Sequence, residues 1–129
     1  MRATVVVAMA LGIAVCTPSF AETSAMDADV MCLAAIGLLP EVNQKSHVMS
    51  DEQAQQTTLM GTMYYMGKVT GRDPKFDLES ALVARLAQLD NTTLGTALMR
   101  CGGELQEQGG RWQAMGKHMM ERAKDPLKP

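Results

Sequence analysis

The sequence predicts an all-α protein, a four-helix bundle-like domain in which one disulfide joins the first helix to the last. Apolar residues recur at steps of three and four, the period of one helical face. No run alternates with the two-residue period of a strand. Two cysteines, Cys32 and Cys101, remain once the predicted signal peptide is removed, and they lie in the first and last helical segments.

The N-terminus has the pattern of a secretory signal peptide over residues 1–21. Arg2 supplies the positive start, an apolar run follows, and the segment ends in a small-x-small cleavage site at Ala21. The apolar run is shorter than the roughly 20 residues that a membrane-spanning helix needs. We therefore expect cleavage after Ala21 and a soluble periplasmic or secreted protein with a single helical domain over residues 22–129. Lipidation at Cys16 stays open, although Val15 stands where lipoproteins normally carry a small residue.

The first helix is predicted to begin between Ser24 and Asp27 and to end at Leu39. Pro40 disfavours helical geometry at the residue before it, so it should stop this helix. The polar segment 41–49 is expected to be a loop that leaves His47 in solvent.

The second helix opens with a strong start signal, because Ser50 and Gln53 have the spacing of a capping box. We expect it to run to about Val69, with Gly71 placed to end it. Its methionines at 60, 63 and 66 share one face, which we predict to be the core face. Tyr64 and Tyr65 are separated by about 100° of rotation, so one should pack while the other reaches the rim.

Asp77 is placed to cap a third helix that continues to Asn91, which in turn can cap a long fourth helix to Arg122. The fourth helix has an apolar row and a seven-residue repeat of glycine: Leu94, Leu98, Cys101, Leu105, Trp112, Met115 and Met119, beside Gly95, Gly102, Gly109 and Gly116. The glycine stripe should let a neighbouring backbone approach closely. We expect one continuous helix, with Gly109–Gly110 as the candidate break, and a frayed tail over about 124–129.

The spacing and setting of the two cysteines predict a structural Cys32–Cys101 disulfide. Neither cysteine belongs to a CxxC pair, and both lie in apolar helical patterns, which favours a bridge over a metal site or a redox pair. An exported protein also meets an oxidising compartment. Closing a loop of about 70 residues should stabilise the fold by about 4 kcal/mol in the chain-entropy model.

Charge and motifs argue against several function classes. The formal net charge is −2, and the basic residues are scattered singly, so we expect no nucleic-acid partner. His47 and His118 stand beside no serine or cysteine in a catalytic pattern, and there is no GxSxG, HExxH or P-loop motif. Glu104 is expected to be solvated, and Asp29 to complement the dipole of the first helix. We predict no enzymatic activity, no catalytic residue and no cofactor.

Methionine is abundant, and two groups stand out, the second with a histidine: Met60, Met63 and Met66, and Met115, His118, Met119 and Met120. Thioether sulfur and imidazole suit Cu(I). Methionine at helical spacing is nevertheless more often core packing, because its flexible side chain fills irregular gaps. We therefore predict no metal ligands, and keep a periplasmic methionine-rich copper-binding protein as an alternative.

Two stretches carry a family resemblance: Tyr64 to Pro74 and Cys101 to Leu105. They resemble small uncharacterised exported proteins of alphaproteobacteria, over most of the chain beyond the signal peptide. The resemblance implies a bacterial origin, a periplasmic address and paired cysteines, and it implies no activity.

Taken together, the sequence favours a binding or structural module of the cell envelope, with an unknown protein partner, over an enzyme. The plan is also broadly similar to that of small two-cysteine periplasmic chaperones of acid stress. An acid-stress chaperone is therefore a second alternative, in which low pH protonates carboxylates and loosens the helix packing.

Overall fold

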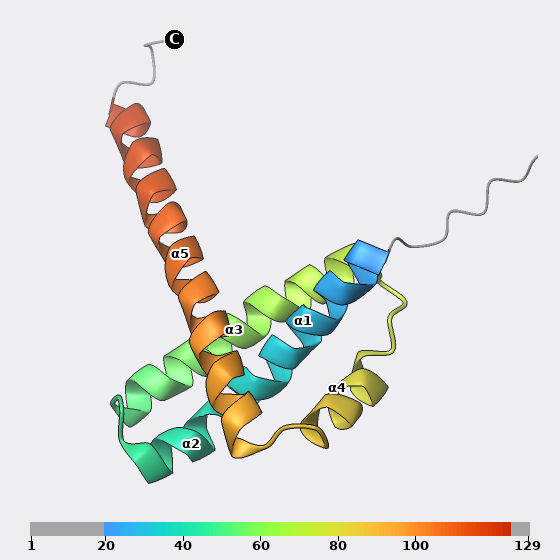
Figure 1. Ribbon diagram of the computed structural model, residues 1–129. Helices are drawn as coiled ribbons and strands as arrows, with labels where there is room; N and C mark the ends of the chain where they lie inside the picture. Colours follow the sequence, from blue (N-terminus) through green and yellow to red (C-terminus); the bar gives the residue numbers. More distant parts are fainter. Residues whose placement is uncertain (1–19, 125–129) are drawn as a thin grey trace, which may run out of the picture.

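The computed structural model describes residues 20–124, which form helices joined by short connections (Figure 1). Within this range there is no strand, and the helices are α1 (Phe20–Gly37), α2 (Leu39–Ser46), α3 (Asp51–Arg72), α4 (Leu78–Leu86) and α5 (Asn91–Lys124). The predicted all-α class is confirmed, although the described residues contain five helices and not four. Residues 1–19 of the predicted signal peptide, Cys16 among them, and the tail beyond Lys124 lie outside the described range.

The additional helix is α2, where the sequence predicted a loop over 41–49. The first helix does end before Pro40, but at Gly37, and Pro40 then occupies the first turn of α2. Proline is tolerated there because the first N–H groups of a helix have no partner within it. The chain leaves α2 at His47, which is exposed and has a left-handed φ of 49°, with its N–H donating to the Asn43 carbonyl.

The side chain of Asn43 fixes the turn between α2 and α3. It is 1% exposed. Its amide nitrogen donates to Asp51 Oδ1 at 3.1 Å, and its amide oxygen accepts from the backbone N–H of Met49 at 3.1 Å. A buried amide with both ends paired holds one geometry, so α2 is positioned tightly against the start of α3.

The capping signals read from the sequence were largely correct. Ser50 and Gln53 form the predicted capping box, although α3 continues three residues beyond Val69. Asp77 caps α4, which ends at Leu86 and does not reach 91. The cap of α5 is Asp90 and not Asn91, because Asp90 Oδ1 accepts from the Thr93 N–H at 2.7 Å. Helix α5 passes through Gly109–Gly110 without a break.

The core lies around α1, which packs against α3, α4 and α5 (Figure 1). The Cys32–Cys101 disulfide joins α1 to α5 as predicted, with 5.5 Å between the two Cα atoms. Its buried neighbours come from α1 and α3: Leu33, Ile36 and Tyr65. The cross-link is therefore part of the hydrophobic core.

Only the first half of α5 belongs to that core. Leu98, Cys101 and Leu105 pack against other helices, whereas Figure 1 shows the C-terminal half of α5 extending away from them. Trp112 and Met115 are 45% and 55% exposed. The apolar row of α5 therefore continues beyond Leu105 outside the core, although Trp112 still meets Tyr64 of α3 edge-on.

The close helix approach predicted for the glycine stripe of α5 occurs elsewhere, at Gly61 of α3. A Cβ added at Gly95, Gly102, Gly109 or Gly116 would meet nothing within 4 Å. At Gly61 it would lie 2.9 Å from Ile36 Cδ1 and 3.0 Å from Leu105 Cδ1. Gly61 is therefore the position where α1 and α5 both come close to α3.

Replacing Gly61 with alanine should lower the free energy of unfolding. The overpacking cost of about 1–3 kcal/mol exceeds the gain of about 1 kcal/mol in helix propensity. Gly67→Ala is the matched control, since Gly67 lies in the same helix with open space around it, and it should stabilise the protein by about 0.5–1 kcal/mol. Urea denaturation of both variants measures the difference, and equal effects of the two substitutions would contradict the packing at Gly61.

Candidate functional site

A group of charged side chains, here called the charge cluster, joins α1, α3 and α5: Asp29, Lys68, Arg72 and Glu104. Asp29 of α1 is 4% exposed. Its carboxylate accepts from Lys68 Nζ at 2.7 Å and from the guanidinium of Arg72, both on α3. A buried carboxylate is tolerated only when it is paired in this way.

Glu104 of α5 completes the charge cluster on the other side of Lys68. The Lys68 ammonium lies 2.5 Å from Glu104 Oε1, and the Tyr64 hydroxyl donates to the same oxygen at 2.8 Å. The Tyr65 hydroxyl lies 3.1 Å from Glu104 Oε2 and 3.1 Å from the Cys101 carbonyl. The prediction that Glu104 is simply solvated was therefore wrong.

The charge cluster was not predicted from the sequence, because its four charges come from three helices that lie far apart in the chain. Asp29 was expected in an opening turn, but α1 begins at Phe20, so Asp29 lies in the helix interior facing α3. A signal was present: Tyr64, Lys68 and Arg72 follow one another at four-residue spacing on one face of α3. A polar row beside the buried Tyr65 could have indicated buried pairing.

The charge cluster shifts the ionisation of its members. Partial burial raises the pKa of Glu104. Hydrogen bonds from Lys68 and Tyr64 lower it by more, so the pKa of Glu104 is below its ordinary value. Burial lowers the pKa of Lys68, but its hydrogen bonds to Asp29 and Glu104 outweigh this, and its pKa is raised. Burial, together with the Glu104 charge and hydrogen bond, raises the pKa of Tyr65. The cluster thus favours charged Lys68 and Glu104 and a neutral tyrosine.

The members of the charge cluster are paired with one another and with the two tyrosines. Asp29 accepts from Lys68 and Arg72. Glu104 accepts from Lys68, Tyr64 and Tyr65. Among the described residues no buried side-chain nitrogen or oxygen lacks a partner, and no three His, Cys, Asp or Glu side chains are grouped to hold a metal ion. The charge cluster holds three helices in register.

The second feature is apolar and exposed. Met60, Met63 and Met66 were predicted on the core face of α3, but they are 54%, 68% and 43% exposed. The core face is the one that carries Ala54, Gly61, Tyr65 and Val69, which are all buried. The prediction was wrong because α1 packs on the side of α3 that carries Gly61, where the missing side chain leaves room for it. The methionines lie on another side of α3.

Three open hollows adjoin one another along the outer side of α3 and the root of α5, and all three include Met60. Their volumes are about 260, 340 and 460 Å³. We call their combined lining the methionine surface: Val48, Met49, Gln53, Gln56, Thr57, Met60, Met63, Tyr64, Gly102, Leu105, Gln106 and Trp112. No residue of this lining is charged.

Tyr64 connects the methionine surface with the charge cluster. Its ring meets Trp112 edge-on at 6.1 Å between centroids and Tyr65 edge-on at 4.9 Å. Its hydroxyl meanwhile binds Glu104. As expected for neighbouring tyrosines on a helix, Tyr65 is fully buried and Tyr64 lies at the rim.

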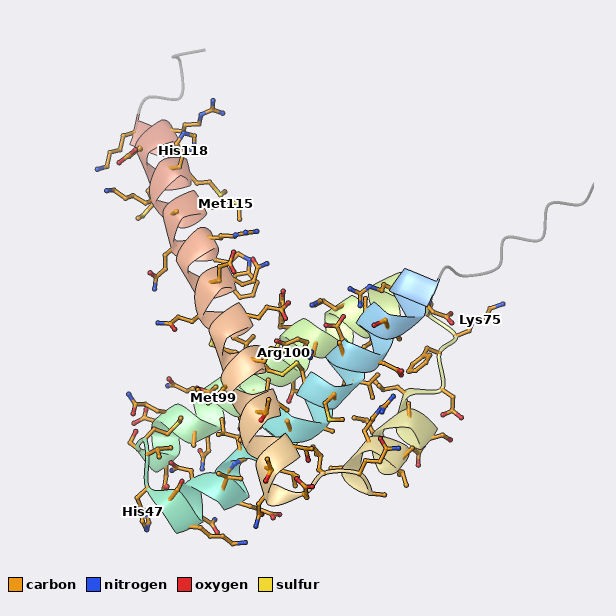
Figure 2. The ribbon with its side chains drawn as sticks, viewed as in Figure 1. His47, Lys75, Met99, Arg100, Met115 and His118 are labelled. Atoms are coloured by element: carbon orange, nitrogen blue, oxygen red, sulfur yellow. A yellow bond between two sulfur atoms is a disulfide. The ribbon has the colours of Figure 1, made fainter. Side chains whose placement is uncertain are left out.

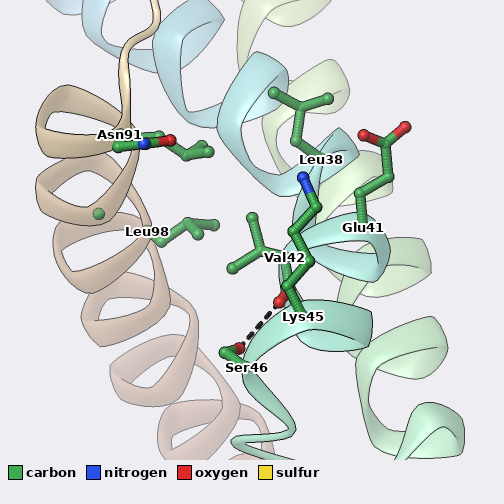
Figure 3. Close-up of a pocket in the computed structure, with 9 residues that line it drawn as sticks. Leu38, Glu41, Val42, Lys45, Ser46, Asn91 and Leu98 are labelled. Carbon is green, nitrogen blue, oxygen red and sulfur yellow. Dashed lines mark hydrogen bonds between the residues drawn. The ribbon is translucent and has the colours of Figure 1, made fainter.

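A further hollow of about 290 Å³ lies between α2 and the first turns of α5. Figure 3 shows Val42 and Leu98 on opposite sides of it, with the Ser46 hydroxyl donating to the Val42 carbonyl. Glu41 and Lys45 line it as well. It is more polar and isolated than the methionine surface.

The second methionine group lies apart from the first. Met115, Met119 and Met120 are 55%, 63% and 65% exposed, and Figure 2 shows Met115 and His118 on the extending half of α5. The structure therefore does not bring the two methionine groups into one site.

Comparison of the chain with protein-family models, curated proteins and solved structures found no match. Among the helices of the described range, none has the length and apolar character required to cross a bilayer.

Glu104→Gln should reduce stability near neutral pH by about 1–2 kcal/mol, the lower part of the range for hydrogen bonds to a charged group. Because the folded pKa of Glu104 is lowered, its contribution is present above the unfolded pKa and is lost as pH falls through the folded value. The stability difference between wild type and variant should therefore shrink as the pH falls below the unfolded pKa of about 4.3. Urea denaturation from pH 7 to 3 measures this.

Glu107→Gln is the control for that measurement. Glu107 pairs only with Arg111 on the surface, and both side chains are 66% exposed. Exposed pairs contribute little, so this variant should follow the wild type at every pH. A Glu104→Gln curve parallel to the wild type would contradict the role assigned to the charge cluster.

Proposed function

We propose that the protein is an exported, non-enzymatic binding module that takes apolar, uncharged segments of partner proteins on its methionine surface. The observation that carries this proposal is the uncharged lining of three adjoining hollows, in which Met60, Met63 and Trp112 are about half exposed or more. Contiguous exposed apolar surface of this kind is typical of interaction sites.

The shape of the methionine surface favours an elongated partner over a small molecule. From Gln53 to Tyr64 it follows about 16 Å of helix axis at 1.5 Å per residue. That length matches about five residues of an extended segment or three turns of a helix. A small ligand is usually held in a cavity that covers most of its surface, whereas these hollows are open to solvent.

The chemistry of the lining fits a peptide. Methionine side chains adapt to differently shaped apolar partners, and they occur at surfaces that bind several targets. The amides of Gln53, Gln56 and Gln106 stand among them and can pair with backbone groups of the bound segment. Trp112 supplies a large aromatic anchor, the residue type most often dominant in binding energy.

Two observations support the exported and non-enzymatic parts of the proposal. The Cys32–Cys101 disulfide fits a protein that works in an oxidising compartment, such as the periplasm or the cell exterior. The carboxylates and the lysine of the charge cluster bind one another and the tyrosines. These contacts support a structural role for the cluster.

The proposal is tested with a permanently unfolded probe, reduced and carboxymethylated α-lactalbumin carrying a fluorophore. Binding measured by fluorescence anisotropy should weaken at least tenfold in the Met60→Gln/Met63→Gln double variant, a loss of about 1.4 kcal/mol. Met99→Gln is the matched control, because Met99 is 82% exposed on α5 and lies outside the methionine surface. Circular dichroism confirms that each variant is folded. No binding by the wild type, or equal losses in both variants, would contradict the proposal.

The charge cluster favours a second candidate function, an acid-activated chaperone. Asp29 and Glu104 are the carboxylates through which α1 and α5 pair with Lys68 and Arg72 of α3. Protonating them removes those pairs, and the disulfide keeps α5 attached to α1 while α3 separates. Apolar surface around Tyr65 and Leu105 would then become available to unfolded clients.

In this second case, binding of an apolar dye should rise near pH 3, and the protein should keep a client soluble there but not at pH 7. Glu104→Gln should move the onset of dye binding to higher pH, and Glu107→Gln should leave it unchanged. A protein that stays compact at pH 3 and protects no client would rule this candidate out.

A further inference from the structure

The extending half of α5 carries three soft or borderline ligands on one helical face: Met115, His118 and Met119. They stand at positions i, i+3 and i+4 of an unbroken helix, so they are neighbours on its surface. Met115 and Met119 are 55% and 63% exposed, and His118 is exposed. Figure 2 shows this part of α5 clear of the other helices.

Exposure removes the ordinary explanation for these methionines. A methionine at helical spacing usually fills a gap in a core, but this part of α5 lies outside the core. An apolar docking face could equally be built from leucine, and it would not need His118 between the two methionines. Neither core packing nor an apolar docking face therefore explains why two thioethers and an imidazole lie together here.

The spacing allows the three side chains to reach one ion. Cβ atoms at i, i+3 and i+4 lie about 5–6 Å apart, and methionine has three rotatable bonds beyond Cα with which to turn its sulfur inward. The intervening residues, Gly116 and Lys117, project from other faces of the helix. Two sulfurs and one imidazole nitrogen can therefore converge above a single turn.

The donor set selects the kind of ion. Thioether sulfur prefers soft ions such as Cu(I), and imidazole accepts copper, whereas carboxylate and carbonyl oxygens suit hard ions.

We propose that Met115, His118 and Met119 form a surface site for a monovalent soft metal ion, Cu(I), bound by two thioether sulfurs and one imidazole nitrogen. Binding is a ligation without electron transfer, so Cu(I) enters and leaves in the same oxidation state. The site is independent of the methionine surface, which uses different residues.

The purified protein is titrated anaerobically with Cu(I) in competition with bicinchoninate, a chromogenic Cu(I) chelator. One equivalent should be withdrawn from the chelator. The variant Met115→Leu/His118→Gln/Met119→Leu keeps the apolar row and the helix propensity, and it should bind at least 100-fold more weakly. Met60→Leu/Met63→Leu is the matched control, an exposed methionine pair at i, i+3 that should leave the affinity unchanged.

A second measurement locates the ion directly. In protein labelled with [methyl-¹³C]methionine, Ag(I), an air-stable monovalent probe, should shift the methyl signals of Met115 and Met119 and leave that of Met99 in place. Circular dichroism shows whether the triple variant keeps its helix content. Absence of competition by the wild type, retained affinity in the triple variant, or a loss in the Met60/Met63 control would each overturn the proposal.

Discussion

The Cys32–Cys101 bond is the constraint on which the other features depend. It fixes the root of α5 against the central helix α1 inside the hydrophobic core, and both candidate surfaces are built at that root. Glu104 lies one turn after Cys101 and so reaches Lys68. Leu105 follows and packs beside Gly61, so the same cross-link positions the α5 wall of the methionine surface.

The charge cluster favours one relative arrangement of α1, α3 and α5, of which the disulfide joins α1 and α5. Buried ion pairs contribute modest net stability because desolvation offsets much of their attraction, but an unpaired partner is strongly unfavourable. Asp29 accepts only an arrangement in which Lys68 and Arg72 both face it. The pairing acts together with the burial of Gly61, Tyr65 and Val69 on the packed side of α3, and the methionines at 60, 63 and 66 lie exposed.

Local signals could be read from the sequence, and long-range ones could not. The Ser50–Gln53 capping box and the Asp77 cap depend on residues within one turn, and both were correct. The stop at Leu39 was not, because α1 ends at Gly37 and Leu39 already begins α2. The disulfide was predictable because only two of the three cysteines lie beyond the predicted signal peptide, and two cysteines allow one pairing. The outward face of α3 was not, since apolar periodicity does not distinguish a buried methionine row from an exposed one.

The candidate site shows the same division. The second methionine group was noticed in the sequence, but only its position on the extending half of α5 shows that core packing does not explain it. The contact between Asp29 and Lys68 joins residues 39 positions apart in the chain, and no local pattern relates them. Close helix approach was assigned to the repeated glycines of α5 because spacing suggested it, whereas the space around each glycine depends on which helix lies opposite. Gly61 belongs to no regular repeat of glycine, yet side chains of α1 and α5 lie against it.

The unsupported length of α5 has a thermodynamic consequence. Beyond Trp112, whose ring meets Tyr64 of α3, the helix has Gly116 and lies clear of the other helices. An isolated helix of about 12–15 residues or fewer is marginal in water, and an interior glycine weakens it by about 1 kcal/mol relative to alanine. Coil and helix are thus nearly isoenergetic over this segment, and it can unwind without disturbing the cross-linked core. A ligand that binds only the helical form will shift this equilibrium toward the helix. Ligand binding to the segment and helix formation in it are therefore coupled.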